Sequence, residues 1–241
     1  MRTASTTTAV ARLLVRIGLI GPIGLIGGAA LLLAACGGAA SPAPATAVAT
    51  TTAPTAAVSV GGTWTVGAGS KASARVREQL VNVPAPSDAV LVATGAKGSF
   101  SLRADGTFSD DSKISFDLST LASDQRGRDD FVKRTTLAVT QFPTAELVPL
   151  KTTGLALPLA ANGDFTFKLA AKLTIHGMTK DVTFDVVAKR SGGDLTAAAT
   201  LNPPLRFGDF GMSPPAVALR VVSVVDEIRL VVDLVATGPA N

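Results

Sequence analysis

The sequence of 241 residues contains one cysteine, one histidine, one tryptophan and no tyrosine. A single cysteine excludes an intramolecular disulfide, so the fold depends on its apolar core even in an oxidising compartment. One histidine and one thiol are too few for a zinc site built from these ligands. A Ser-His-Asp triad would need His176, which ends a strand-like segment beside a tight turn. A bond from this histidine to nearby backbone is the more ordinary role.

Carboxylates occur in adjacent pairs at Asp110-Asp111 and Asp129-Asp130, and two carboxylates can in principle cleave a glycoside. Adjacent acids on a turn or in the first turn of a helix are usually solvated or capping. Gly67-Ala68-Gly69 is too short for a phosphate-binding loop and opens no helix. These patterns predict a protein that is not an enzyme and that has no metal site.

The N-terminal segment 1–35 has the pattern of a signal peptide. Arg2, Arg12 and Arg16 precede a stretch from Ile17 to Ala35 without any charge. That stretch ends in Leu-Ala-Ala-Cys-Gly, a branched apolar residue and two small residues before Cys36, which is typical of bacterial lipoproteins. We therefore expect lipidation at Cys36 and an exported protein held to the cell membrane or envelope on its extracytoplasmic side.

Two alternatives to a lipoprotein are an uncleaved membrane anchor and simple secretion. The uncharged stretch nearly reaches the roughly 20 residues that cross a bilayer. Five glycines and a proline interrupt it, however, and small residues before a lone cysteine fit a lipoprotein cleavage site. Three of the 22 basic residues and none of the 18 acidic residues precede Cys36, so the mature chain is almost neutral. This balance gives no support to nucleic-acid binding.

Segment 36–60 consists of the cysteine and a run of alanine, threonine, proline, serine, glycine and valine. Such a composition cannot bury enough surface to offset the entropy lost on ordering. It is typical of a tether, spanning roughly 27 Å as a flexible coil or about 74 Å as polyproline II. The remaining segment, 61–238, is long enough for one domain.

Apolar residues in that domain recur at every second position, which is the period of β-strands. Between Asp164 and Ile175, apolar and polar residues alternate without a break. Shorter stretches of the same kind follow one another with turn residues between them. They lie at 99–102, 113–118, 182–186 and 227–235. Regularly spaced strands with short turns indicate an all-β sandwich or a closed antiparallel barrel.

Residues 124–134 interrupt this period, because they are too polar and charge-rich for a strand. Asp129 and Asp130 precede Lys133 and Arg134, an order that complements a helix dipole. We predict a short helix here, with Phe131, its one large apolar residue, directed at the barrel.

The aromatic inventory is almost free of hydroxyl groups, with ten phenylalanines, one tryptophan and no tyrosine. Several of these phenylalanines fall on inward faces of expected strands. A packed core and a lined cavity both fit this pattern, because an eight-stranded barrel can either fill its interior or hold one slender ligand. The candidate lining residues are Phe100, Phe116, Phe131, Phe165, Phe167, Leu169, Phe184 and Val186.

Read in order, motifs across the domain resemble the YceI-like family of polyisoprenoid-binding, lipocalin-like envelope barrels. The most specific is 173–180, Leu-Thr-Ile-His-Gly-Met-Thr-Lys, which closely matches the hairpin of that family. The other motifs are Trp64-Thr65-Val66, 118–121 with Asp124 and 128–131, 141–146, 206–211 and Asp226-Glu227. The sequence departs from the family pattern in two places. Arg206 lies one residue further from Asp209-Phe210-Gly211 than the arginine of the family does, which would suit a β-bulge. Val225 stands where the family has a glycine.

The resemblance implies an extended eight-stranded antiparallel barrel, a helix near one end and a long apolar tunnel for an isoprenoid chain. The expected ligand is a quinone, a polyprenol or a fatty-acid-like lipid, held without a cofactor. The expected role is a carrier or scavenger bound to the membrane through Cys36. A packed barrel that serves as a structural or protein-interaction module of the envelope is the alternative.

Overall fold

The computed structural model describes residues 59–240. Ten strands form one antiparallel sheet, accompanied by one short α-helix and three other short helical segments. The elements, in chain order, are β1 Ser59–Val66, β2 Lys71–Leu80, β3 Ser87–Ala93, β4 Lys97–Arg103, β5 Lys113–Asp117, η1 Leu118–Thr120, α1 Arg126–Phe131, η2 Val132–Thr136, β6 Thr144–Thr153, β7 Asn162–Ile175, β8 Met178–Ser191, β9 Asp194–Leu201, η3 Phe207–Phe210 and β10 Val221–Thr237.

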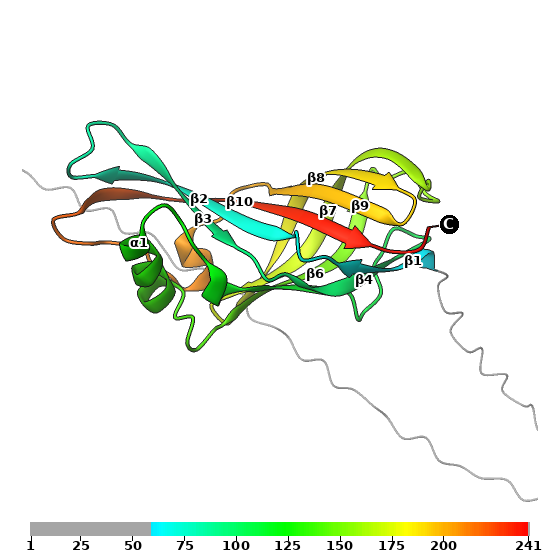
Figure 1. Cartoon of the computed structure of the whole chain (residues 1–241), viewed down its shortest axis with the longest axis horizontal. Helices are drawn as coiled ribbons and strands as arrows, with labels where there is room; N and C mark the ends of the chain where they lie inside the picture. The colour runs from blue at the N-terminus through cyan, green and yellow to red at the C-terminus, as the bar shows by residue number, and fades with distance from the viewer. Residues whose placement is uncertain (1–58, 241) are drawn as a thin grey trace, which may run out of the picture. The chain divides into compact units, whose positions relative to one another are not determined.

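Eight of the strands close into a ring in the order β1-β4-β5-β6-β7-β8-β9-β10, and β10 pairs back onto β1. The predicted eight-stranded antiparallel barrel is therefore confirmed. Strands β2 and β3, which the sequence motifs did not separate from the ring, extend the sheet as a hairpin on β10 (Figure 1). The predicted short helix is also confirmed, as α1 followed by the π-helical turns of η2.

The central hairpin β7–β8 shows how the alternating sequence produces the barrel wall. All fourteen residues of each strand pair across it, from Asn162 with Ser191 to Ile175 with Met178. Along β7 every second residue lies at least partly buried, namely Phe165, Phe167, Leu169, Ala171 and Leu173, while the residues between them, including both lysines, are exposed. A sheet with one apolar and one polar face gains burial only by curving its apolar face inward.

The turn of this hairpin depends on His176 and Gly177, whose φ angles are 52° and 73°. Two positive φ angles are the requirement of the tight type I′ hairpin turn. A side chain at residue 177 would also meet the ring of Phe142 at 2.6 Å. Glycine is therefore needed here both for backbone conformation and for close packing.

Strand β10 runs through both parts of the sheet. Residues from Val221 to Asp233 pair with β2 along one edge, residues from Val231 to Thr237 pair with β9 along the other, and the last two residues also pair with β1. Its register against β2 shifts between Val224 and Ile228, where the carboxylate of Asp226 accepts a hydrogen bond from the backbone N–H of Phe207 at 2.9 Å. The bulge expected near Arg206 thus occurs as a register shift in β10. Arg206 itself is the N-cap residue of η3, and its backbone N–H donates to the carboxylate of Asp209.

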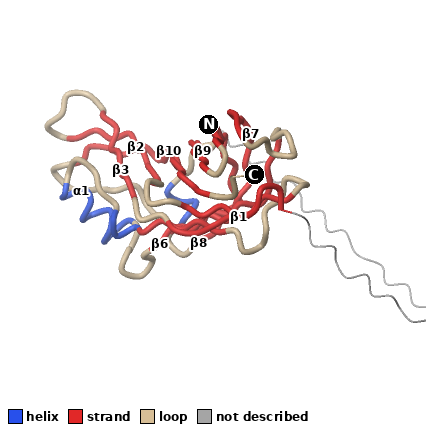
Figure 2. The backbone as a smooth tube through the Cα atoms, turned by 45° about the vertical axis from the view of Figure 1, so that its right-hand side comes forward, coloured by secondary structure: helices blue, strands red, loops and turns tan. Residues whose placement is uncertain are grey.

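The two ends of the barrel differ in their cover (Figures 1 and 2). At one end the β2–β3 hairpin, α1 and the loop before β10 project together, and we call this the open end. At the other end the β6–β7 connection and the segment after β10 fold over the barrel, and we call this the closed end.

Candidate functional site

The interior of the barrel contains an apolar cavity of about 410 Å³ that begins at the open end. Its walls come from β2, β3, β5, η1, β6, β7, β8, β10, η3 and the helical segment 126–137. The deep wall includes Phe116, Leu173 and Phe184, which are at most 5% exposed. Side chains therefore do not fill the barrel, and the packed-core alternative does not describe this interior.

The polar residues of the cavity wall lie near its mouth. They are Glu78, Gln125, Arg128, Arg134, Thr136 and Arg220. Gln125, Arg134 and Arg220 are exposed to solvent, so the cavity opens between the helical segment and the loop before β10. An apolar interior with polar groups only at its entrance suits a chain-like ligand that enters by its apolar end.

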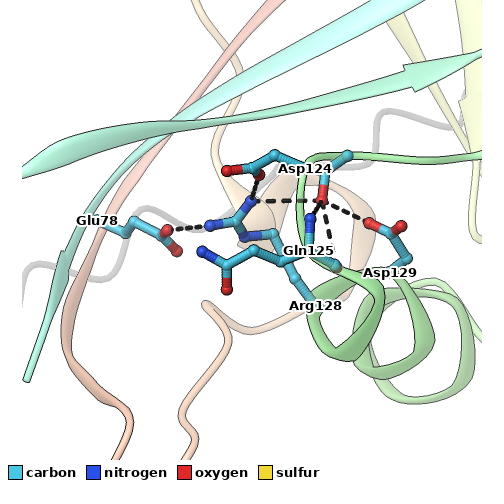
Figure 3. A network of polar contacts seen from close by, with 6 residues as sticks. Glu78, Asp124, Gln125, Arg128 and Asp129 are labelled. Carbon is cyan, nitrogen blue, oxygen red and sulfur yellow. Dashed lines mark hydrogen bonds and ion pairs between the residues drawn. The ribbon is translucent and has the colours of Figure 1, made fainter. Parts of the chain in front are cut away.

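A network of charged groups fixes α1 beside this mouth (Figure 3). Arg128 donates to Glu78 of β2 across 2.5 Å, and the side chains are only 13% and 7% exposed. Arg128 also pairs with Asp124. Nearby, the hydroxyl of Ser123 donates to the buried Asp129. Because a buried ion pair is costly to break, this network holds α1 on β2 and keeps Phe131 against the cavity.

A second cavity of about 100 Å³ lies toward the closed end, with Trp64 and Phe108 in its wall. Leu147 of β6 and Val232 of β10 border both cavities. These strands lie four places apart in the ring of eight and therefore face each other. Leu147 and Val232 thus form a constriction between the two cavities.

The closed end is built around the buried side chain of Arg190, which is 2% exposed. Its guanidinium lies 5.0 Å from the centre of the Trp64 ring. It donates to the carbonyl groups of Leu159, Ala160 and Pro239 over 3.2 to 3.4 Å. One side chain thus ties the β6–β7 connection and the C-terminal segment to the first strand at this end.

The structure places every candidate lining residue on the wall of one cavity or the other. Phe116, Phe131 and Phe184 border the larger cavity. The smaller cavity is bordered by Phe100, Phe165, Phe167, Leu169 and Val186. Their role in ligand binding stays a prediction. Cys36 lies outside the described residues, and its lipidation also stays a prediction.

Sequence patterns missed the charged residues of both ends, Glu78, Arg128 and Arg190. Glu78 shares the inward face of β2 with Ala74 and Val76, and Arg190 shares that of β8 with Val186. A charge on the apolar face of an alternating strand is the signal that could have identified Glu78 and Arg190, whereas Arg128 lies on α1 and gives no such signal.

The other polar groups considered from sequence lie apart from the cavities. The His176 ring donates from Nδ1 to the Phe210 carbonyl at 3.1 Å and packs against Phe142. Asp110 and Asp111 are exposed on a turn. Within residues 59–240, no group of three or more acidic, histidine or cysteine side chains could hold a metal ion. In the same part of the chain, no helix has the length and apolarity to cross a membrane.

A closed antiparallel barrel with an internal apolar cavity and a polar mouth defines a class of small-molecule-binding barrels. Residues 66–236 match the YceI-like domain, and the chain belongs to this family. The recognition made from the sequence motifs is therefore confirmed.

Two solved structures show the same fold. A polyisoprenoid binding domain from Saccharophagus degradans, implicated in plant cell wall breakdown, aligns with a TM-score of 0.54 and 11% identity over 74% of this chain and 99% of that one. BcnA of Burkholderia cenocepacia aligns with a TM-score of 0.50 and 22% identity over 71% of this chain and 99% of that one. No curated protein matches the chain.

Proposed function

We propose that the protein is a non-catalytic carrier or scavenger that binds an isoprenoid or another long-chain lipid inside the barrel. The observation that carries this proposal is the apolar cavity of about 410 Å³. Each methylene that enters such a cavity from water gains about 0.8 kcal/mol, so apolar walls alone can provide affinity. The polyisoprenoid binding of the Saccharophagus degradans domain supports this ligand class.

The cavity volume indicates the length of chain that the barrel encloses. An apolar protein cavity of about 150 Å³ holds one benzene ring. By that measure the cavity of 410 Å³ holds about 16 carbon atoms, or roughly three isoprene units. The smaller cavity of 100 Å³ adds about four carbon atoms when the chain passes the constriction. We therefore expect a chain of about 15 to 20 carbon atoms to fit best.

The test is to extract the purified protein with organic solvent and to identify bound lipid by mass spectrometry. Farnesol, geranylgeraniol and longer polyprenols are then added to delipidated protein, and the melting temperature is measured. We expect the largest increase for the two shorter alcohols. No bound lipid and no increase with any of them would refute lipid binding.

Two variants with the same added ring, one inside the cavity and one outside the barrel, test where the lipid binds. Ala74 of β2 is half-buried and borders the larger cavity, while Ala198 of β9 is exposed. Ala74→Phe should reduce the increase in melting temperature and shift the preference toward shorter chains, because the ring takes up about a third of the cavity volume. Ala198→Phe adds the same ring outside the barrel and should leave the increase unchanged.

We further propose that a lipid on Cys36 anchors the protein to the outer side of a cell membrane, with segment 36–60 as the tether. The support is the signal-peptide pattern that ends at the only cysteine. Metabolic labelling with a radioactive fatty acid tests this directly. The native protein should carry the label and sediment with membranes, and Cys36→Ala should not carry it. Label on Cys36→Ala would overturn the assignment.

A further inference from the structure

Exposed apolar side chains gather at the open end of the barrel. Of the nine large apolar side chains that are exposed among the described residues, five lie on the hairpin tip after β2 or on the start of β10 and the loop before it. We call these five the apolar rim: Val81, Val83, Leu219, Val222 and Val225. Leu219 is 91% exposed, which is unusual for a leucine.

The two segments that carry the rim lie side by side. The backbone N–H of Val81 donates to the carbonyl of Arg220 at 3.0 Å, and Leu80 pairs with Val221. Neither 81–86 nor 213–219 contains a charged residue. Leu219 also has a φ of 63°, a conformation that costs a leucine roughly 1–2 kcal/mol. Neither its backbone conformation nor its exposure is explained by packing within the barrel.

The rim is continuous with the cavity. Along the loop and the start of β10, Val217, Val221 and Val224 border the cavity, while the rim residues Leu219, Val222 and Val225 are exposed. On this side of the mouth, apolar side chains therefore extend from the barrel interior to the outside, with Arg220 as the charged residue among them. A lipid that crosses the mouth on this side remains in contact with apolar side chains.

We propose that the apolar rim docks on the surface of a lipid bilayer, so that a lipid passes between the bilayer and the cavity without crossing water. This inference rests on the proposed lipid-binding function. Exposed basic residues lie near the rim: Arg126 and Arg134 belong to the helical segment beside the mouth, and the side chain of Arg220 adjoins Gly127. Arginine side chains at this depth reach headgroups while apolar side chains enter the acyl boundary.

The expected tether is long enough for this orientation. Strand β10 connects the rim with the closed end, and its 17 residues span roughly 55 Å. Strand β1 also joins the barrel at the closed end, where Val66 pairs with Ala236. A tether of about 74 Å can therefore start at a lipid in the same bilayer and pass the length of the barrel.

Fluorescence can test the docking, because the only tryptophan, Trp64, is 1% exposed at the closed end and gives a constant background. Leu219→Trp places a second indole on the rim. The matched control is Val187→Trp, at a position on β8 that is 60% exposed and lies outside the rim. Each purified variant is mixed with vesicles of phosphatidylcholine containing some phosphatidylglycerol, with or without brominated acyl chains.

We expect the emission of Leu219→Trp to shift to shorter wavelength with vesicles and to be quenched by bromines about 5–10 Å below the headgroups. The Val187→Trp control should show neither effect. Unchanged Leu219→Trp emission with vesicles would overturn the proposal. A shift without vesicles that grows with protein concentration would also overturn it, because a second copy of the chain would then cover the rim.

A second pair of variants separates docking from cargo binding. Leu219→Asp combined with Val222→Asp should weaken vesicle binding about 100-fold, because two apolar side chains no longer leave water. The same variant should still bind added polyprenol in solution. Ala74→Phe should weaken the binding of long polyprenols and keep vesicle binding. If both variants keep vesicle binding, the docking is refuted. If the native protein does not bind polyprenol, the proposed function is refuted instead.

Discussion

Each end of the barrel holds a buried arginine, and the two arginines are held in different ways. At the closed end, backbone carbonyl groups and the Trp64 ring surround Arg190. At the open end, Arg128 pairs with the carboxylates of Glu78 and Asp124. The first arrangement ties three segments of main chain together, and the second attaches one short helix to the sheet. The chain segments at the closed end are thus held together through main-chain groups, whereas the wall of the mouth at the open end depends on side-chain charges.

The largest effect is expected at the closed end. Arg190→Met keeps much of the side-chain volume but removes the charged donor from the partly buried carbonyl groups of Leu159, Ala160 and Pro239. We expect the free energy of unfolding to fall by about 3–5 kcal/mol, because several hydrogen bonds from a charged group and its contact with the Trp64 ring are lost together. Urea denaturation measures this. Arg75→Met on the exposed face of β2 is the control, and an equal loss in both variants would contradict the role of Arg190.

The second largest effect is expected at the constriction between the two cavities. Leu147 is 3% exposed, and Leu147→Ala should lower the free energy of unfolding by about 2–4 kcal/mol through the lost apolar contact and the added cavity. It should also join the two cavities and shift the preferred ligand toward longer chains by about four carbon atoms. Competition between polyprenols of different length, followed by native mass spectrometry, measures the shift. An unchanged preference would mean that the constriction does not select length.

A smaller effect is expected from the ion pair at the mouth. Glu78→Gln removes the buried charge that faces Arg128 and should lower the free energy of unfolding by about 2 kcal/mol. Amide hydrogen exchange should accelerate in α1 more than in β8, because only the attachment of the helix is weakened. Asp124→Asn is a matched control, since its side chain is 74% exposed and its pair with Arg128 is worth less. Uniform acceleration across the barrel would contradict this local role.

The smallest effect concerns pH. Hydrogen bonding from Arg229, with a further contribution from Arg77, holds the pKa of Asp88 on β3 below its usual range. A lowered pKa means that the ionised carboxylate stabilises the hairpin at neutral pH and that this contribution is lost as pH falls below about 4. Asp88→Asn should therefore flatten the fall of melting temperature between neutral and acidic pH. An identical pH profile would refute the contribution.

The sequence predicts those parts of the molecule whose side chains alternate without interruption. The long repeat from Asp164 to Ile175 identified β7, and the polar insert identified α1. The β2–β3 extension was not predicted, because alternation shows a buried face and not the neighbouring strand. The two cavities were not predicted as separate either, since the division at Leu147 depends on which strands face each other across the ring.

The contacts of Arg190 also have a practical consequence for attaching the protein to a surface. Its guanidinium holds Pro239, and a side chain at Gly238 would collide with Trp64, so β10 leaves the barrel directly at the closed end. A linker fused after the last residue would suspend the domain by that end, with the mouth facing away from the support. A flexible spacer is needed to leave Gly238 and Pro239 in place. A sensor surface built this way would attach every domain by its closed end and leave its mouth accessible to the sample.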